Sequence, residues 1–497
     1  MRVTFVYPDL LECVPSYRGA FYSGVAILSA VLKAEGHETT LIHITDPSYG
    51  EAQFAKDIKT HRPDLIAFSS TTNGYPVVRM LASYLHRTAG STPTIYGGIH
   101  PTLAPYQSID TPGIDMICLG EGDLCLAQVC RSLEEGREVD NIAGLWVKKD
   151  GAVVRNLMPM LVSNLDTLPF ADRDLFQYPS LYNERLGNAT FMASRGCPYS
   201  CNYCSNRGLR KIYSGKGRYV RFRSVDNLMV EIREVLERYA FVRRIHFDDD
   251  ILFMRREWAL EFTQRYPKEI GLPFYSNIHP RLCTPETVAL LAQAGCKELR
   301  IGLESGNRTI RKEVLNRNMD NEVIIKAFHL ARDYGIRVKA FNMIGLPHEN
   351  ASGILDTVKL NARAMVDEIQ LSIFHPYPGT VLYDMCHADK LVSNRRVSSY
   401  YMGSILDLPD LTGEQLRMFQ RYFHTFAKVY MAVYRLPKTV VGIAERILDY
   451  TLSNRSTPVL LRMTSPFPYA IKSGIRVLKN MMGKGRDAVP PPSVRGT

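Results

Sequence analysis

Three cysteines that lie close together constrain this chain more than any other feature. Cys197, Cys201 and Cys204 form a CxxxCxxC spacing, after the apolar run 189–193 and a Ser-Arg-Gly turn. A loop of this length can place three thiolates on one face of an iron–sulfur cube, and such cubes are held by cysteines, usually four. With three local cysteines, one iron would lack a protein ligand. An open iron of this kind can bind a substrate or cofactor and pass it an electron.

Two other interpretations of the cysteines stay open at this point. The thiols could be core residues that fall close together, or they could be ligands of a zinc ion. The spacing and the glycines that follow (Gly208, Gly215, Gly217) disfavour the core interpretation. Structural zinc takes four ligands, and no paired CxxC lies nearby to complete such a set.

The composition is that of an ordinary globular protein, and 497 residues suffice for two or three domains. Ten cysteines without a regular framework, together with a first segment that is typical of a strand, predict a reducing cytoplasmic location. No uninterrupted apolar run reaches the ~20 residues that a membrane-spanning helix needs.

The net charge of +11 is concentrated at the C-terminal end. Residues 411–497 hold 14 Lys and Arg but 4 Asp and Glu, so +10 of the charge lies there. A nearly neutral body argues against a nucleic-acid groove, and we expect no nucleic-acid partner. Residues 469–482 place an apolar stripe beside a basic one, which suits either an anionic membrane surface or a helix packed on the body.

The first 150 residues alternate strand-like and helix-like patterns, which predicts an α/β fold with a doubly wound, Rossmann-like parallel sheet. In such sheets ligands bind beyond the carboxyl ends of the strands. The candidate binding loops are therefore those that follow the predicted strands: residues 8–21, 69–74, 97–103 and 120–123. Any one of these small, polar loops could equally be a simple strand–helix turn.

Six strand-like runs with helical patterns between them predict a partial (β/α)6 barrel of the TIM type in the second half. These runs are residues 189–193, 244–247, 274–277, 298–302, 338–343 and 368–374. Polar residues follow them, where barrels carry their chemistry. For Asp248 or Asp250 the alternative is helix N-capping, and Tyr377 is either a substrate contact or part of a rigid turn.

The segment CPYSCNYC resembles the cluster loop of radical S-adenosylmethionine (SAM) enzymes. The resemblance implies that the three cysteines ligate a [4Fe–4S] cluster whose fourth iron binds SAM. Reductive cleavage of SAM would then give a 5′-deoxyadenosyl radical that abstracts hydrogen from an unactivated carbon. The residues implied to contact SAM are Tyr203, Asp248, Asp250, Asn277, Glu304, Ser305 and Asn342.

The N-terminal half resembles the cobalamin-binding domain of one radical SAM subgroup, through FYSGVAILSAVLKAEGHE, GGIHPT and LGEGD. The residues implied to contact cobalamin are Ser69, Ser70, Thr71, Gly97, Gly98, His100 and Glu121. The DxHxxG motif that supplies a cobalt ligand in other cobalamin proteins is absent, as is common in this subgroup. The alternatives are a cobalamin-type fold that no longer binds cobalamin, and a His100 that only satisfies backbone groups.

We expect five segments: a cobalamin-binding-like domain (1–150), a linker (151–188), the barrel (189–400), a basic helical region (401–483) and a disordered tail (484–497). The domain order implies a cobalamin-dependent radical SAM enzyme that methylates a carbon, or closes a ring as magnesium-protoporphyrin ester cyclases do. The basic end favours an apolar lipid, isoprenoid or tetrapyrrole substrate and peripheral membrane contact.

The resemblance also implies a low-potential electron donor such as flavodoxin or ferredoxin. Two further functions stay open. One is methylthiolation of tRNA, which would need three more clustered cysteines and an RNA-binding module. The other is a cobalamin or cluster carrier without catalysis.

Overall fold

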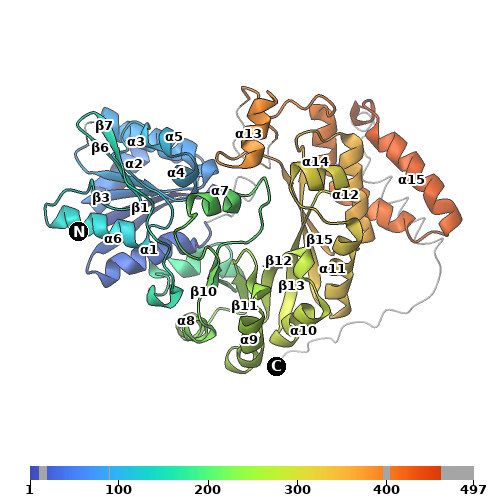
Figure 1. Cartoon of the computed structure of the whole chain (residues 1–497), viewed down its shortest axis with the longest axis horizontal. Coiled ribbons are helices and arrows are strands. Elements are labelled where there is room, and N and C mark those ends of the chain that lie inside the picture. Colours follow the sequence, from blue (N-terminus) through green and yellow to red (C-terminus); the bar gives the residue numbers. More distant parts are fainter. Residues whose placement is uncertain (11–18, 89, 396–402, 460–497) are drawn as a thin grey trace, which may run out of the picture.

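The computed structural model describes residues 1–10, 19–88, 90–395 and 403–459. Two α/β units stand side by side, and helices of the C-terminal region cover the far edge of the second unit (Figure 1). The predicted fold class is therefore confirmed. The amphipathic stretch 469–482 and the tail 484–497 lie outside the described residues.

The first sheet has the strand order β2-β1-β3-β4-β5-β6-β7. Its first five strands are parallel, and β6 and β7 add an antiparallel hairpin. The strands are β1 (Arg2–Pro8), β2 (Glu38–Ile44), β3 (Leu65–Ser69), β4 (Thr94–Gly97), β5 (Met116–Cys118), β6 (Leu145–Lys149) and β7 (Ala152–Arg155). The direction of winding changes between β1 and β3, and in doubly wound sheets ligands bind at this point.

Helices connect the strands of the first sheet. They are α1 (Ser23–Ala34), α2 (Glu51–His61), α3 (Tyr75–Arg87), α4 (Ile99–Leu103), α5 (Pro105–Ile109) and α6 (Asp123–Glu134). All five residues of β3 are buried, as is typical of a parallel strand covered by helices on both faces.

The second sheet is a six-stranded parallel half-barrel with the order β15-β14-β13-β12-β11-β8. Its strands are β8 (Asn188–Phe191), β11 (Arg244–Phe247), β12 (Phe274–Ile278), β13 (Cys296–Glu304), β14 (Arg337–Ile344) and β15 (Glu368–Ile373). The alternating helices are α8 (Val225–Arg238), α9 (Arg256–Glu269), α10 (Pro285–Ala294), α11 (Asn321–Asp333) and α12 (Ala351–Arg363). A short antiparallel pair, β9 (Ser194–Arg195) and β10 (Arg221–Phe222), flanks α7 (Ser205–Ile212).

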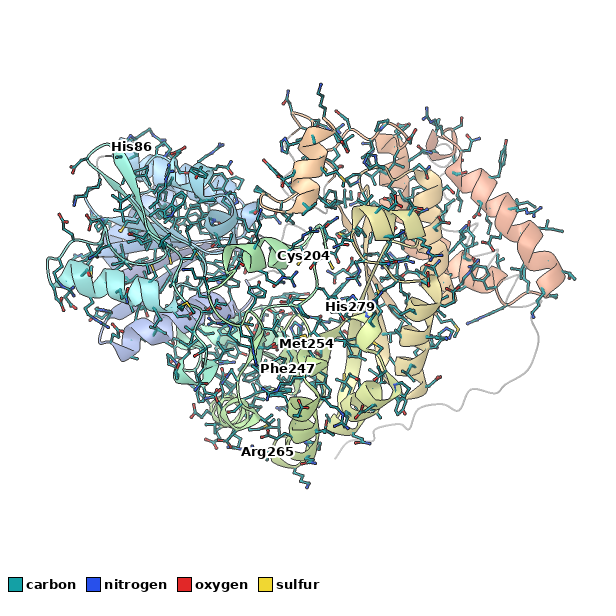
Figure 2. All side chains as sticks on the ribbon, viewed as in Figure 1. His86, Cys204, Phe247, Met254, Arg265 and His279 are labelled. Atoms are coloured by element: carbon teal, nitrogen blue, oxygen red, sulfur yellow. The ribbon has the colours of Figure 1, made fainter. Side chains whose placement is uncertain are left out.

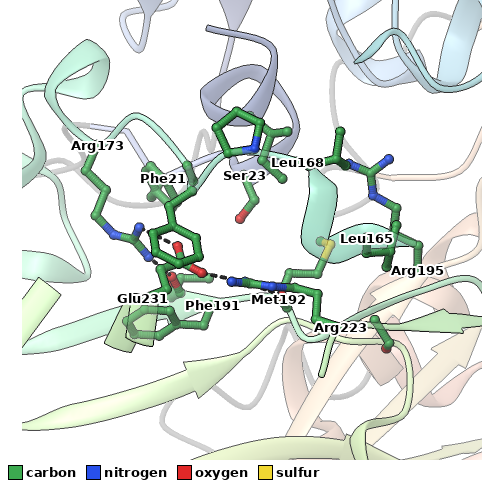
Figure 3. A pocket seen from close by; sticks show the side chains of 16 residues that line it. Phe21, Ser23, Leu165, Leu168, Arg173, Phe191, Met192, Arg195, Arg223 and Glu231 are labelled. Atoms are coloured by element: carbon green, nitrogen blue, oxygen red, sulfur yellow. Dashed lines mark hydrogen bonds and ion pairs between the residues drawn. The ribbon is translucent and has the colours of Figure 1, made fainter. Parts of the chain in front are cut away.

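One continuous hydrophobic core runs through both sheets and the predicted linker between them. Figure 3 shows the polar anchor of this linker: Arg173 Nη1 lies 2.8 Å from Glu231 Oε1, and Arg223 pairs with the same carboxylate. The Arg173 guanidinium stacks 5.0 Å from the Phe21 ring and 4.7 Å from the Phe191 ring. A buried carboxylate with two cations is costly to break, so the linker is fixed to both units.

The C-terminal region is helical where it is described, with α13 (Val381–Ala388), α14 (Gly413–Val433) and α15 (Lys438–Ser453). A capping box between Thr412 and Gln415 starts α14, whose apolar side packs on α12. Within the described ranges, no helix is both long and apolar enough to cross a membrane.

Candidate active site

The cluster loop (residues 197–204) carries the three predicted cluster ligands, and Figure 2 places Cys204 between the two units. Cys201 is buried, Cys197 and Cys204 are half-buried, and all three are free thiols. Burial raises the pKa of Cys197 to about 12 and also raises the pKa of Cys204. A metal that binds here must therefore displace protons from the thiols.

Asn202 fixes the cluster loop to the barrel. Its backbone N–H donates to Leu315 O at 3.0 Å, and its side-chain amide donates to Val314 O at 2.8 Å. Its own carbonyl accepts from the Leu382 N–H at 3.1 Å, at the start of α13. The backbone between Cys201 and Cys204 is thus held from two sides before any metal binds.

The donors around the sulfurs fit an iron–sulfur cluster better than a single metal ion. Arg317 Nη1 lies 3.6 Å from Cys201 Sγ, and Asn206 Nδ2 lies 3.6 Å from Cys204 Sγ. Cationic and N–H donors of this kind stabilise thiolate ligands. Nowhere in the described ranges do three His, Cys, Asp or Glu side chains gather closely enough to hold one metal ion. The four protein ligands that structural zinc takes are thus not found together among the described residues.

A cavity of about 420 Å³ separates the first sheet from the cluster loop. Four of the predicted cobalamin contacts line it: Ser69, Gly97, Gly98 and Glu121. A Cβ at Gly98, where φ is +101°, would stand 2.8 Å from Ser70 O, whereas a Cβ at Gly97 would meet nothing closer than 3.9 Å. The floor is bare backbone at the carboxyl ends of the strands, and this fits the close approach of a large flat cofactor.

The other three predicted cobalamin contacts, Ser70, Thr71 and His100, do not line this cavity. Ser70 Oγ is bonded to Tyr96 OH at 2.7 Å, and Thr71 is exposed outside the cavity. His100 is buried against the Tyr75 ring at 4.2 Å, with Nδ1 3.2 Å from Thr72 Oγ1. Burial lowers the pKa of His100 to about 4, so the imidazole is a neutral core group.

Two arginines, Arg195 of β9 and Arg221 of β10, form ion pairs with the GEGD loop (residues 120–123), which lines the cavity. Arg195 makes two bonds to the Asp123 carboxylate, at 2.7 and 3.1 Å, and Arg221 Nη1 lies 3.0 Å from Glu121 Oε2. The Glu121 carboxylate is thereby committed to an arginine, although the residue lines the cavity. Arg195 stands two positions before Cys197, so the cluster loop is tied to the first sheet.

Sequence reasoning did not identify these arginines. One signal was present, because residues 185–225 hold nine Lys and Arg and no Asp or Glu. Because no carboxylate lies within this segment, any ion pair of these nine cations must be formed with a carboxylate outside the segment.

The three consecutive aspartates after β11 have three different environments. Asp249 is buried and accepts from the Ala193 N–H at 3.0 Å, which holds the end of β8. Asp250 accepts from Asn206 Nδ2 at 3.1 Å, and Asp248 is exposed to the cavity. Burial raises the pKa of Asp248 and of Asp249 to about 6.

The alternative, in which Asp248 or Asp250 caps a helix, is wrong, since neither the turn Leu252–Met254 nor α9 has a side-chain cap. Both carboxylates line the cavity instead, where the enclosing protein limits their contact with bulk water.

A second cavity, of about 380 Å³, lies inside the half-barrel on the other side of the cluster loop. Tyr203, Glu304 and Asn342 line it, and so do His375 and Tyr377 from the end of β15. Tyr203 OH donates to Glu304 Oε1 at 3.0 Å, and burial raises the pKa of Glu304. Since Ser205 and Asn206 line the first cavity, the cluster loop separates the two spaces.

Asn277 and Ser305 line neither cavity. Asn277 Nδ2 donates to Asp249 O at 2.8 Å, and the wholly buried Ser305 Oγ accepts from the Asn307 N–H at 3.3 Å. Ser305 is therefore enclosed by protein and does not face solvent.

Two further side chains at strand ends have partners that the sequence did not indicate. The Asn342 side chain faces Asn361, which donates to it at 2.7 Å. The Tyr377 carbonyl accepts from Thr380 Oγ1 at 2.7 Å in a turn, and the Tyr377 hydroxyl accepts from Asn73 Nδ2 of the first unit at 3.3 Å.

Comparison with protein families matches both units. Residues 21–148 match the model of the B12 binding domain, and residues 192–360 match that of the Radical SAM superfamily. The chain belongs to the radical SAM superfamily. It is a radical SAM enzyme with a B12-binding domain, and its cofactors are a [4Fe–4S] cluster, SAM and cobalamin. The two matched segments cover most of the half-barrel, without β8 and β15, and most of the first sheet, without β1 and β7.

Relatives of this radical SAM enzyme extend the comparison over most of the chain. An uncharacterised methyltransferase of Pyrococcus horikoshii is 27% identical over 448 residues, which are 89% of this chain and 94% of the relative. A hopanoid C-3 methylase of Methylococcus capsulatus is 26% identical and covers 76% of this chain and 71% of its own.

The fold is also that of a solved radical SAM structure. The cobalamin-dependent SAM radical enzyme OxsB, solved with aqua-cobalamin bound, superposes with a TM-score of 0.67 at 16% identity. The match covers 93% of this chain and 75% of OxsB.

Proposed function

We propose that the enzyme transfers a methyl group from SAM to an unactivated carbon of a small, apolar substrate. The observation that carries this proposal is the first cavity, which is bounded on one side by the bare backbone of Gly97 and Gly98. On the other side it is bounded by Ser205 and Asn206, directly after Cys204. The names of the Pyrococcus and Methylococcus relatives, both of which refer to methyl transfer, support the same reaction.

When bound, the cluster and SAM supply the 5′-deoxyadenosyl radical that removes hydrogen, and cobalamin supplies the methyl group. The chain's own residues hold and orient these groups. Cys197, Cys201 and Cys204 would hold the cluster, and the carboxylates of Asp248 and Asp250 would accept from the SAM ammonium group. Because both carboxylates lie in a shielded cavity, their attraction for a cation is stronger than in water.

The walls of the first cavity favour an apolar substrate. Side chains of Ile27, Leu28, Ile99, Leu126 and Leu209 face it from helices of the first unit and from α7. Such walls exclude water and place few polar hydrogens near a reactive carbon radical. A lipid, isoprenoid or tetrapyrrole is the substrate class that matches them.

The other functions have weaker support. A tRNA methylthiotransferase would need a second set of clustered cysteines, but Cys118, Cys125 and Cys130 are buried in the core of the first unit. No three-residue metal site forms there among the described residues. Ring closure without methyl transfer could use the same two units and cofactors. The product analysis described next distinguishes it from methylation.

The proposal is tested with full-length enzyme purified without oxygen and loaded with iron, sulfide and cobalamin. Incubation with trideuteromethyl-SAM, a reductant and an apolar cell extract should give 5′-deoxyadenosine and S-adenosylhomocysteine in comparable amounts, with label in an extracted lipid. A ring-closing enzyme would form 5′-deoxyadenosine without labelled product. A carrier would form neither nucleoside, and either result contradicts methylation.

We further propose that an acidic, low-potential electron-transfer protein docks beside the cluster loop. A surface hollow of about 320 Å³ opens on Pro198 of that loop, and Arg218 and Arg255 line it. Arg218 and the adjacent Lys216 have no carboxylate partner within ion-pair distance among the described residues. Complementary charge of this kind mainly accelerates association.

Charge reversal of this surface, Lys216→Glu with Arg218→Glu, should slow cluster reduction by reduced flavodoxin at least ~10-fold. Reduction by methyl viologen radical should stay unchanged, because a small reductant does not need the docking surface. Stopped-flow bleaching of the cluster absorbance measures both rates, and Lys326→Glu on α11 is the matched control. Equal slowing with both reductants would mean that the cluster, rather than docking, is affected.

A further inference from the structure

Helix α15 packs on the barrel with its two carboxylates facing inward. The Asp449 carboxylate accepts from Lys359 Nζ at 2.9 Å, and Glu445 Oε1 accepts from Arg363 Nη2 at 3.2 Å, both across the contact with α12. These ion pairs flank an apolar contact, in which Leu448 and Leu452 of α15 join the hydrophobic cluster of α12 and α14. A surface helix normally buries its apolar side in this way and leaves polar residues outside.

Leu448 and Leu452 of α15 pack inward on the cluster formed with α12 and α14, but other apolar side chains of the helix face away from the protein. They form a stripe of four residues, each 45 to 77% exposed: Val440, Ile443, Ile447 and Tyr450. The spacings of three, four and three residues place all four on one side of the helix. A contiguous exposed apolar stripe marks a contact surface, because water solvates it poorly.

Exposed cations without a carboxylate partner lie on α15 and just beyond both of its ends. Arg435, Lys438, Arg446 and Arg455 are exposed, and within the described part of the chain none lies within ion-pair distance of a carboxylate. The two carboxylates of α15 are engaged with Lys359 and Arg363 on the inner side. The outward surface of α15 thus combines an apolar stripe with exposed cations on the helix and at both of its ends, which is the pattern of helices that lie on anionic membranes.

Charge distinguishes between the candidate occupants of this surface. Residues 460–497 follow directly and carry seven Lys and Arg but one Asp, so they would set cations against cations. A second copy related by a two-fold axis would likewise bring the same exposed cations together. An anionic lipid surface complements these cations and accepts the apolar side chains.

We infer that α15 docks the enzyme on an anionic lipid bilayer, with the apolar stripe in the headgroup boundary and the cations beside lipid phosphates. The helix lies at the outer edge of the molecule, away from the first sheet (Figure 1), so the flanking units do not cover it. The inference deepens the proposed function, on which it rests for its biological purpose, because a membrane is where an apolar substrate would be found.

Vesicle partition of the full-length enzyme tests the inference. Phosphatidylcholine vesicles that contain phosphatidylglycerol should bind the wild type, and added salt should weaken this binding. Ile443→Ser with Ile447→Ser should reduce partition at least ~10-fold, since two apolar side chains no longer leave water. Leu157→Ser, at a residue 81% exposed on the first unit, should leave partition unchanged.

A local probe separates α15 from the rest of the chain. The tryptophan introduced by Ile447→Trp should shift its emission to the blue on these vesicles and be quenched by brominated lipid, whereas that of Leu157→Trp should not. Unchanged partition of the double serine variant, or an unquenched signal from the Ile447→Trp variant, overturns the inference, and contact with an acidic protein would give that result. SAM cleavage without vesicles should be equal in all variants, so failure of docking and failure of the proposed reaction are distinguishable.

Discussion

Replacing Cys201 by alanine is expected to abolish SAM cleavage and the broad visible absorption of the iron–sulfur cluster. The loop would keep two thiolates, and a cube held by two cysteines loses its buried ligand and its contact with Arg317. Iron and sulfide per protein and 5′-deoxyadenosine formation, measured after anaerobic reconstitution, should both fall to background.

The matched control is Cys283→Ala. Cys283 lies in the same half-barrel, where its thiol donates to the His279 carbonyl at 3.9 Å and the residue packs against the hydrophobic core. This variant should bind iron as the wild type does. A Cys201→Ala protein that keeps its colour and iron content would contradict the assignment of the cluster loop.

Gly97→Val is expected to prevent cobalamin binding without removing SAM cleavage. The added side chain meets no atom closer than 3.9 Å from its Cβ, so the fold accepts it, but its methyl groups enter the first cavity. Cobalamin affinity should fall at least ~10-fold, or by about 1.4 kcal/mol. The cobalt-to-iron ratio and the visible spectrum of the loaded protein measure this loss.

Gly50→Val is the control for this substitution, because Gly50 precedes α2 in the same unit, with open space around its Cβ and at a distance from the cavity. It should retain cobalt. Methyl transfer should be lost in Gly97→Val while 5′-deoxyadenosine is still formed. If Gly97→Val binds cobalamin normally, the first cavity is not the cobalamin site.

Local patterns predicted the parts of this site that depend on local sequence. The cysteine spacing and the apolar runs of the barrel strands are short-range features, and the predicted strand 244–247 coincides with β11. Which way a side chain faces is different. His100 lies on a glycine-preceded turn that the sequence identified, but the packing of α4 against Tyr75 directs the imidazole away from the cavity.

Long-range ion pairs could not be predicted in this way. Arg195 and Asp123 are 72 positions apart, and Arg221 and Glu121 are 100 apart. The inward orientation of the α15 carboxylates depends on Lys359 and Arg363 of another helix. Each of these charged side chains has many possible partners in the sequence. The three-dimensional arrangement of the elements decides which of them lies close enough to pair.

The continuous core through the linker has a consequence for evolution and for engineering. Since Arg173 serves both units and Arg195 and Arg221 reach back to the GEGD loop, the functional boundary between the units does not coincide with the ends of the predicted linker. If the first unit were replaced by that of a relative, the contacts of Arg173, Arg195 and Arg221 would be mismatched unless residues 165–223 were replaced together with it. Recombination within this lineage should therefore preserve that stretch as one inherited block.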